Sequence, residues 1–367
     1  MKVPVSERTE LENRILAWMR DPCWSSDETR FNELALELFA LQYAQCEPYR
    51  RFCAARRRSP GKVAHWSEIP PVPTGAFKEF SLCCFPPHTA QRIFRTSGTS
   101  TQQRGALYLD TLTLYEASLL ASFTRCVLPD LLPHELMTFL ILAPSGEEAP
   151  DSSLSYMLDV VVRKKGTQHS GFFVRSGKLY GEELLAVLER TANAGEAVTL
   201  CGTAFAFMHW LDGCVRKAAR LALPIASRIM ETGGFKGRSR ELPRSEFYAL
   251  LEEFTGISRG HIINQYGMTE LGSQFYDSNL RYPGLRRRKL APPWTRLRFL
   301  DTTLENEVAE GETGIIAIYD LANTGSVFAV QTADVGRRVE TGFEIFGREV
   351  SAEERGCSIA ADAMLAD

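Results

Sequence analysis

The sequence predicts an α/β fold with mixed sheets flanked by helices, and two features of the chain support this prediction. Through the first two thirds, short apolar runs of strand length alternate with amphipathic stretches of helix length. The last third instead holds several strand-like runs joined by turns. Helices that alternate with strands and give way to a strand-rich end are typical of an α/β domain. A chain of 367 residues is long enough to bury a sizeable core in one large domain or two ordinary ones.

The N-terminal part is expected to be helical and then extended. Residues 28–56 carry apolar side chains at helical spacing, which predicts an amphipathic helix that breaks near Pro48. These apolar positions are Phe31, Leu34, Leu38, Leu41 and Tyr43. The proline-rich stretch 67–80 is predicted to be extended and to lead into the first sheet.

Strands and helices are then expected to alternate as far as residue 277. The expected order is strand, polar loop and strand over 91–110, helix over 111–127, strand over 135–144, helix over 182–193, strand and helix over 197–221, strand and glycine loop over 225–239, helix over 244–255, and strand and loop over 261–277. Further strands are expected over 294–301, 311–322 and 327–340. We expect each glycine-bearing loop to lie at the carboxyl end of a strand, where such sheets bind ligands.

The composition argues against several classes of protein. The net charge of −3 creates no field that would favour nucleic acid. The chain contains no apolar run long enough to span a membrane, and its start lacks the apolar region of a signal peptide. Nine scattered cysteines without CxxC spacing indicate a reduced cytoplasmic protein, neither a disulfide scaffold nor a zinc module.

The loop over residues 95–105, RTSGTSTQQRG, is a candidate cradle for phosphate. It packs five Ser/Thr residues and two glycines into eleven positions. Hydroxyl groups and free backbone N–H groups both donate hydrogen bonds to anions. The loop is not a Walker A motif, because it lacks the G-K-[ST] ending. An ordinary turn is the alternative interpretation of this composition.

The stretch NQYGMTE, residues 264–270, combines three side chains that suit a nucleotide. Tyr266 offers a ring for stacking on a purine, Thr269 a hydroxyl for a phosphate, and Glu270 a hard oxygen ligand for Mg²⁺. The same residues would also fit the start of a helix with an acidic first turn.

Two further loops complete the set of candidates. The glycine pair Gly233–Gly234 would let the backbone approach a flat ring closely. Asp334, which precedes Val335 and Gly336, could accept hydrogen bonds from both hydroxyls of a ribose. A turn-capping aspartate is the alternative at that position.

In this order, the motifs resemble those of the adenylate-forming enzyme superfamily, whose members join a carboxylate to ATP and release pyrophosphate. The matching pieces are TSGTSTQQRG, GGFKG, NQYGMTE, TADVGR and IFGRE. Along nearly the whole chain, the sequence more closely resembles the LuxE-type acyl-protein synthetases of bacterial bioluminescence operons, which are relatives of phenylacetate–CoA ligases. The stretches that carry this closer resemblance include IPPVPTGAFKEF, ETGGFKGRSRE, IINQYGMTELGSQFYD, YDLANTGSVFAVQTADVGR and RGCS.

The resemblance implies a role for each matching residue. The phosphate loop corresponds to Thr96, Ser97, Gly98, Thr99 and Ser100, and the adenine side of the site to Gly233, Gly234, Tyr266 and Gly267. Thr269 would touch the α-phosphate, Glu270 would hold Mg²⁺, Asp334 would bind the ribose, and Arg348 would lie near the ribose or phosphate at the domain hinge.

The chain departs from the superfamily pattern in two places. Gln103-Arg104-Gly105 replaces the usual Pro-Lys-Gly, so Arg104 keeps the positive charge but presents a planar fork. In the superfamily a mobile C-terminal domain with a catalytic lysine follows the Gly-Arg pair, and the short stretch after Arg348 leads us to expect that this domain is missing here. We therefore expect an adenylation domain over 1–345, with a helical lead-in over 1–60, and a short arm over 346–367.

The resemblance implies a two-step reaction. A fatty acid, by analogy a long-chain one, would be activated with ATP as an acyl adenylate and then passed to Cys357 as a thioester. Arg348 and Arg355 could favour the thiolate of Cys357 electrostatically. The implied partners are an NADPH-dependent, LuxC-like acyl reductase and an acyl-transferase acting as a thioesterase. Two alternatives remain: a ligase that loads CoA or a carrier protein, and a non-catalytic subunit of an acyl-reductase complex.

The remaining eight cysteines are expected to be small buried residues. The adjacent pair Cys83–Cys84 suggests no particular chemistry. His209 is expected to be a core histidine, and lining the acyl pocket is the alternative. Its neighbours over 201–212 fit either the wall of such a pocket or ordinary core packing.

Overall fold

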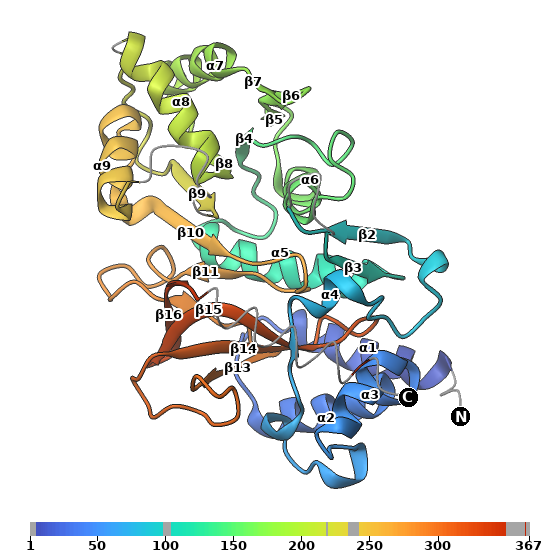
Figure 1. The fold of residues 1–367 in the computed structure, drawn as a ribbon. Coiled ribbons are helices and arrows are strands. Elements are labelled where there is room, and N and C mark those ends of the chain that lie inside the picture. The colour runs from blue at the N-terminus through green and yellow to red at the C-terminus, as the bar shows by residue number, and fades with distance from the viewer. Residues whose placement is uncertain (1–4, 98–103, 218, 234–241, 350–363, 365–367) are drawn as a thin grey trace. The chain divides into compact units, whose positions relative to one another are not determined.

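The computed structural model describes residues 5–97, 104–217, 219–233, 242–349 and 364. The chain forms two compact units. The first unit comprises Met1–Ser122, Gly267–Phe275 and Arg288–Asp367, and the second comprises Phe123–Tyr266 and Tyr276–Arg287. Helix α5 (Thr113–Val127) and strand β11 (Phe275–Asp277) each contain residues of both units. Figure 1 labels most of the helices and strands named below.

The first unit begins with helices and ends with long strands. Its elements are α1 (Val5–Met19), α2 (Glu28–Gln45), α3 (Glu47–Ala55), the 3-10 helices Pro60–Lys62, Trp66–Glu68 and Pro87–Thr89, β1 (Val72–Pro73), α4 (Ala76–Glu79), β2 (Arg92–Arg95), β3 (Ala106–Leu109), β12 (Lys289–Leu290), β13 (Thr295–Leu300), β14 (Gly314–Asp320), β15 (Ala329–Val339) and β16 (Gly342–Arg348).

The strands of the first unit pair mainly in antiparallel fashion. Their order is β13-β14-β15-β16-β12, and β1 adds to β15 in parallel, with Val72 opposite Val330. Every residue of β14 is buried, so both faces of this strand are covered. β2 and β3 form a separate antiparallel pair in which Arg95 lies opposite Ala106. The strands expected in the last third are thus confirmed.

The predicted helix over 28–56 is confirmed as two helices. Cys46 has an extended backbone, with φ −101° and ψ 97°, and Pro48 stands in the first turn of α3. Proline suits this position because the first N–H groups of a helix have no partner within it. Phe31 and Leu38 are buried on the inner face of α2 as expected, whereas Tyr43 is half-buried.

The stretch 67–80 differs in part from the prediction. Val72 and Pro73 form the short strand β1, as expected of a lead-in to the sheet. Ala76–Glu79, in contrast, turns into the helix α4, whose Phe77 is 2% exposed. Burial of this aromatic ring favours a compact turn over the extended form that the prolines suggested.

The second unit is a parallel sheet with helical connections. Its elements are β4 (Thr138–Leu142), α6 (Ser153–Lys165), β5 (Gly171–Phe172), β6 (Val174–Arg175), β7 (Lys178–Leu179), α7 (Gly181–Ala194), β8 (Val198–Thr203), α8 (Ala204–Lys217), β9 (Arg228–Thr232), α9 (Arg244–Thr255), the 3-10 helix Arg259–His261 and β10 (Ile262–Tyr266). The strand order is β10-β9-β8-β4-β5, and every pair is parallel.

Each face of the parallel sheet is covered by helices. Alternate strand residues such as Leu140, Leu200 and Ile229 join the core cluster formed with α7, α8 and α9. On the other face, Phe123 packs against Phe139 with ring centroids 5.9 Å apart, and Tyr276 donates to the sulfur of Met157 in α6. Successive strand residues point to opposite faces, so a strand covered on both sides is mostly apolar, as β4 is with the sequence TFLIL. Figure 1 shows α8 and α9 together beside β8 and β9.

Candidate functional site

The base of the Ser/Thr/Gly loop is closed by hydrogen bonds at the end of the β2–β3 hairpin. Thr96 donates its N–H to the carbonyl of Gly105 at 2.9 Å, and Gly105 donates its N–H to the Thr96 hydroxyl at 2.9 Å. Arg104 donates through Nε to the Thr96 carbonyl at 2.6 Å and through Nη2 to the Arg95 carbonyl at 3.3 Å. Arg104 thus supports the stem of the loop. Ser97 continues from that stem, and Gly98, Thr99 and Ser100 lie outside the described residues.

Thr269 lies at the same stem although it is 174 residues away in the sequence. Its hydroxyl donates to the Arg95 carbonyl at 3.5 Å. Thr269 of the YGMTE motif therefore lies beside Arg95, the residue before the Ser/Thr/Gly loop, and both residues belong to the first unit. The neighbouring Glu270 is 6% exposed, and its backbone carbonyl accepts a hydrogen bond from Asn323 Nδ2 at 2.8 Å.

Asp334 and Arg348 face each other across β15 and β16. They are register partners in the antiparallel pair, and Arg348 Nε lies 3.7 Å from Asp334 Oδ1. The Asp334 side chain is 18% exposed and that of Arg348 is 59% exposed, so both can be reached from solvent. This geometry brings together the proposed ribose ligand and the proposed hinge arginine.

Gly233 and Tyr266 occupy matching positions at the carboxyl ends of β9 and β10, two neighbouring parallel strands of the second unit. Thr232 of β9 pairs with Gln265 of β10, so the next residue on each strand continues the same register. Gly233 has a φ of +77°, a left-handed conformation that side-chain-bearing residues rarely adopt. Gly234 lies outside the described residues, and Gly267 directly follows Tyr266. The expectation that glycine-bearing loops lie at strand ends is confirmed for these two loops. It is wrong for Asp334, Val335 and Gly336, which lie inside β15 and pair with β16.

A buried polar network lies two residues upstream on these same strands. The Glu231 carboxylate is 3% exposed, and its Oε1 accepts hydrogen bonds from Tyr248 at 2.7 Å and from its register partner Asn264 at 2.8 Å. Asp277 accepts from the Asn264 N–H at 3.0 Å and pairs with Arg287 at 3.2 Å. The network therefore ties β9 to β10 just before Gly233 and Tyr266.

Tyr248→Phe should lower the free energy of unfolding by about 1–3 kcal/mol, because it removes one donor from a buried carboxylate. Urea unfolding monitored by circular dichroism measures this change. The matched control is Tyr282→Phe, which alters an exposed tyrosine of the same unit and should stay within about 0.5 kcal/mol of the parent. Equal stabilities of the two variants would contradict a stabilising role for the network.

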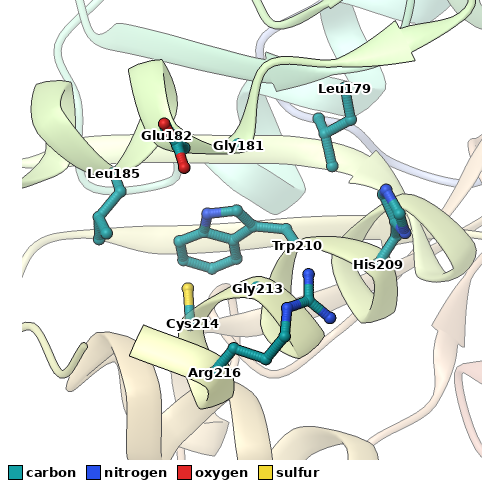
Figure 2. Close-up of a pocket in the computed structure, with 9 residues that line it drawn as sticks. All are labelled: Leu179, Gly181, Glu182, Leu185, His209, Trp210, Gly213, Cys214 and Arg216. Carbon is teal, nitrogen blue, oxygen red and sulfur yellow. The ribbon is translucent and has the colours of Figure 1, made fainter. Parts of the chain in front are cut away.

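A cavity of about 240 Å³ lies between α7 and α8 in the second unit (Figure 2). Trp210 lies against Gly181, whose Cβ position would be 3.3 Å from the indole ring. Leu179, Leu185, His209 and Arg216 line the same cavity. His209 is exposed there, so the expectation of a core histidine is wrong. The register of α8 explains this, since Phe207, Met208, Trp210 and Leu211 take its inward positions.

Seven of the eight cysteines that the structure describes are buried, as expected of small apolar residues. Cys23 is exposed and is the exception to that expectation. Burial raises the pKa of Cys84 well above its ordinary value, and burial also raises the pKa of Cys46 to about 12. Both side chains are therefore held as unreactive thiols near neutral pH. Cys357 lies outside the described residues.

The motif-based reading of the sequence missed two buried polar residues at the end of β14. Asp320 is fully buried and accepts hydrogen bonds from the Ser273 N–H and hydroxyl, each at 2.7 Å. Asn323 is also fully buried and contacts the Glu270 carbonyl. A signal was available, because a polar residue that closes a fully apolar strand needs buried partners.

The stability of the protein should depend on pH through Asp320. Burial raises the pKa of Asp320 to about 6, although hydrogen bonds from Ser273 and Ala322 act in the opposite direction. An aspartate in an unfolded chain has a pKa of about 3.9, so the folded protein binds this proton more tightly than the unfolded chain does. The stabilisation is fully present below the unfolded pKa of about 3.9. It decreases above that value and is lost as the pH rises through about 6.

Lowering the pH from 7 to 5 should thus stabilise the parent by about 1 kcal/mol relative to Asp320→Asn. Urea unfolding of both proteins at the two pH values measures this difference. If the difference in stability between the parent and Asp320→Asn is the same at pH 7 and pH 5, the pKa of Asp320 does not lie in the expected range.

No helix in the described part of the chain is long and apolar enough to cross a membrane.

Comparison with known proteins agrees with this architecture. A family model described as "Acyl-protein synthetase, LuxE" matches residues 5–366. The chain is 25% identical over 319 residues to a long-chain-fatty-acid–luciferin-component ligase of Aliivibrio fischeri, across 85% of this chain and 81% of that protein. It is 25% identical over 370 residues to the ligase of the same name from Vibrio harveyi, across 97% of this chain and 94% of that protein.

A solved structure of 2-hydroxyisobutyryl-CoA ligase in complex with 2-HIB-AMP superimposes with a TM-score of 0.65 at 13% identity, across 88% of this chain and 67% of that chain. The prediction of an α/β fold like that of adenylate-forming ligases is confirmed. The match over residues 5–366 also confirms the resemblance drawn from the sequence motifs. The chain therefore belongs to the LuxE acyl-protein synthetase family of ligases.

Proposed function

We propose that this protein activates a fatty acid with ATP as an acyl adenylate and then transfers the acyl group to its own Cys357. The observation that carries the proposal is the hydrogen bond from Thr269 to the Arg95 carbonyl, which places Thr269 at the stem of the Ser/Thr loop. The names of the two curated relatives support a long-chain fatty acid as the substrate.

Each motif has a proposed part in holding ATP. Thr96, Ser97, Gly98, Thr99, Ser100 and Arg104 would donate hydrogen bonds to the phosphates, and Thr269 would donate to the α-phosphate. Asp334 would accept from the ribose hydroxyls, with Arg348 beside it. Gly233, Gly234, Tyr266 and Gly267 would form the adenine side, where the left-handed backbone of Gly233 supports a close approach.

Glu270 would hold Mg²⁺ together with the phosphates. Magnesium is usually bound by one or two carboxylates, substrate phosphates and several waters, so a single glutamate beside a phosphate loop fits this ion. Bound Mg²⁺ would neutralise charge on the phosphate oxygens. Such neutralisation, with correct positioning, accounts for most of the catalysis in transfers of this kind.

The proposed reaction is a substitution at the α-phosphorus followed by a substitution at the acyl carbon. First, a carboxylate oxygen of the fatty acid bonds to the α-phosphorus, and pyrophosphate leaves. Then the Cys357 thiolate bonds to the acyl carbon, AMP leaves, and the thiol proton passes to solvent. Positive charge from Arg348 and Arg355 would favour the thiolate form.

The arm over 346–367 would carry the acceptor, and residues 1–345 would form the adenylation domain. Glu349 donates its N–H to the Ala333 carbonyl at 2.9 Å, and Met364 is 2% exposed, with its carbonyl accepting from Arg51 at 3.4 Å. Cys357 lies eight residues after Glu349 in the sequence. An extended segment of that length spans about 27 Å, which supports delivery of the thiol to a site on the first unit.

The thioester on Cys357 would pass its acyl group to an NADPH-dependent acyl reductase of the LuxC kind, and an acyl-transferase acting as a thioesterase would supply the fatty acid. We infer a cytoplasmic enzyme, because the eight described cysteines are free thiols, which a reducing compartment preserves.

Fatty-acid-dependent exchange of radioactive pyrophosphate into ATP tests the first step. We expect exchange with long-chain acids in the presence of Mg²⁺ and none when the acid is omitted. A purified, folded protein that shows no exchange with any acid of a chain-length panel would contradict the proposal and favour a non-catalytic subunit.

A further inference from the structure

Asp320, Leu321, Ala322 and Asn323 form a tight turn that begins at the last residue of β14. The Asn323 N–H donates to the Asp320 carbonyl at 3.0 Å, and the Ala322 N–H donates to Asp320 Oδ1 at 3.0 Å. An aspartate that accepts from the backbone two residues onward stabilises such a turn. We name these four residues the 320–323 turn.

The 320–323 turn holds the segment from Glu270 to Ser273 at both of its ends. Asn323 Nδ2 donates to the Glu270 carbonyl at 2.8 Å. Asp320 accepts from the Ser273 N–H and from the Ser273 hydroxyl, each at 2.7 Å. All of these groups belong to the first unit and are nearly or fully buried. Buried hydrogen bonds fix positions strongly, because the groups cannot exchange partners with water.

Close packing at Gly272 reinforces this contact. A Cβ added to Gly272 would lie 2.7 Å from Ala322 Cβ and 2.8 Å from Asn323 Oδ1. Real Cβ atoms do not approach other atoms so closely, so the backbone at Gly272 rests directly against the 320–323 turn. A glycine is therefore required between Glu270 and Ser273.

The 320–323 turn is itself anchored from α2. Gln42 is fully buried, and its Nε2 donates to the Asn323 carbonyl at 2.7 Å and also to the Ser326 carbonyl. Its Oε1 accepts from the Phe328 N–H at 3.1 Å. A single buried amide thus fixes the backbone of Asn323, whose side chain in turn contacts Glu270.

From these contacts, we propose that the 320–323 turn is a positioning element that sets the location of the Glu270 carboxylate for Mg²⁺·ATP, with Asn323 as its key side chain. The inference rests on the proposed role of Glu270 in holding the ion. A carboxylate must be held within about 0.5 Å to serve as a ligand, and the Cα–Cβ direction of Glu270 follows its peptide group. Removing a residue that orients a metal ligand typically lowers metal affinity by about 10–100-fold.

The test uses Asn323→Asp in the full-length protein. This substitution keeps the size of the side chain but replaces the donor by an oxygen that repels the Glu270 carbonyl. Thr324→Val is the matched control, because Thr324 is also buried and its hydroxyl donates to Glu12 of α1 at 2.7 Å. Two readouts are independent of turnover: hydrogen–deuterium exchange of a peptide covering 267–275, and binding of Mn²⁺ with ATP followed by electron paramagnetic resonance.

We expect Asn323→Asp to accelerate amide exchange in 267–275 and to weaken Mn²⁺·ATP binding by at least about ten-fold. Thr324→Val should leave both close to the parent. Unchanged Mn²⁺·ATP affinity in Asn323→Asp, or equal losses in both variants, would overturn the inference. If Asn323→Asp does not fold, Asn323→Ser provides the same measurements, since its shorter side chain loses the contact without adding charge.

These measurements separate the inference from the proposed function. Pyrophosphate exchange by the parent, with Mn²⁺·ATP affinity unaffected by Asn323→Asp, would leave the proposed function standing and overturn the positioning role. Binding of Mn²⁺·ATP without any pyrophosphate exchange would overturn the proposed function, while the positioning role would still be decided by the affinities of the variants. Absence of Mn²⁺·ATP binding in the parent would overturn both.

Discussion

Replacing Cys357 with serine should abolish covalent labelling of the protein by radioactive fatty acid and ATP. A serine hydroxyl ionises far less readily than a thiol, so the acyl group should stay on AMP or be lost to water. Labelling is measured on denatured protein after gel electrophoresis, and intact-mass spectrometry should detect one added acyl group on the parent and none on the variant. Pyrophosphate exchange should be retained, because Cys357 acts only after the adenylate has formed.

Cys23→Ser is the appropriate control for this experiment, because Cys23 is the exposed cysteine among the described residues. It should label as the parent does. Equal labelling of Cys357→Ser would place the acyl group elsewhere and contradict self-acylation at that residue. Efficient thioester formation on added CoA by the parent would instead favour the alternative of a CoA ligase.

Replacing Glu270 with glutamine should lower the rate of fatty-acid-dependent pyrophosphate exchange by about 10²–10³-fold, the range found when one electrostatic contact to a transition state is removed. Glutamine keeps the shape of the side chain but offers Mg²⁺ a neutral oxygen in place of a charged one. The exchange rate is measured over a range of Mg²⁺ concentrations, and the concentration for half-maximal rate should rise.

The control for this substitution is Glu310→Gln, which neutralises an exposed glutamate in the loop before β14 of the same unit. Its exchange rate and its dependence on Mg²⁺ should match the parent. A Glu270→Gln enzyme with the parent rate and the parent Mg²⁺ requirement would remove Glu270 from the metal site.

Much of the fold could be predicted because its signals are local. The alternation of apolar runs with helical patterns located the helix 244–255 and the strands from 295 to 339 to within a few residues. Pro48 predicted a helix break, since proline is tolerated in the first turn of a helix and not in its interior. The helix within 67–80 could not be predicted from local signals, because burial of Phe77 depends on residues far away in the chain.

For the candidate site, too, local features could be predicted from the sequence and long-range contacts could not. The sequence by itself determined the fold class, the loops that close strands, and the residue types available for phosphate, ribose and metal, because backbone propensity and side-chain chemistry are properties of short stretches. Only the tertiary structure decided that Thr269 contacts the Arg95 carbonyl, that Asp334 faces Arg348, and that His209 is exposed.

Tertiary structure also decided that Asn323 and Asp320 hold the backbone around Glu270. The physical reason is that a buried polar group takes whichever partner the folded chain brings to it, and these partners lie tens to hundreds of residues away.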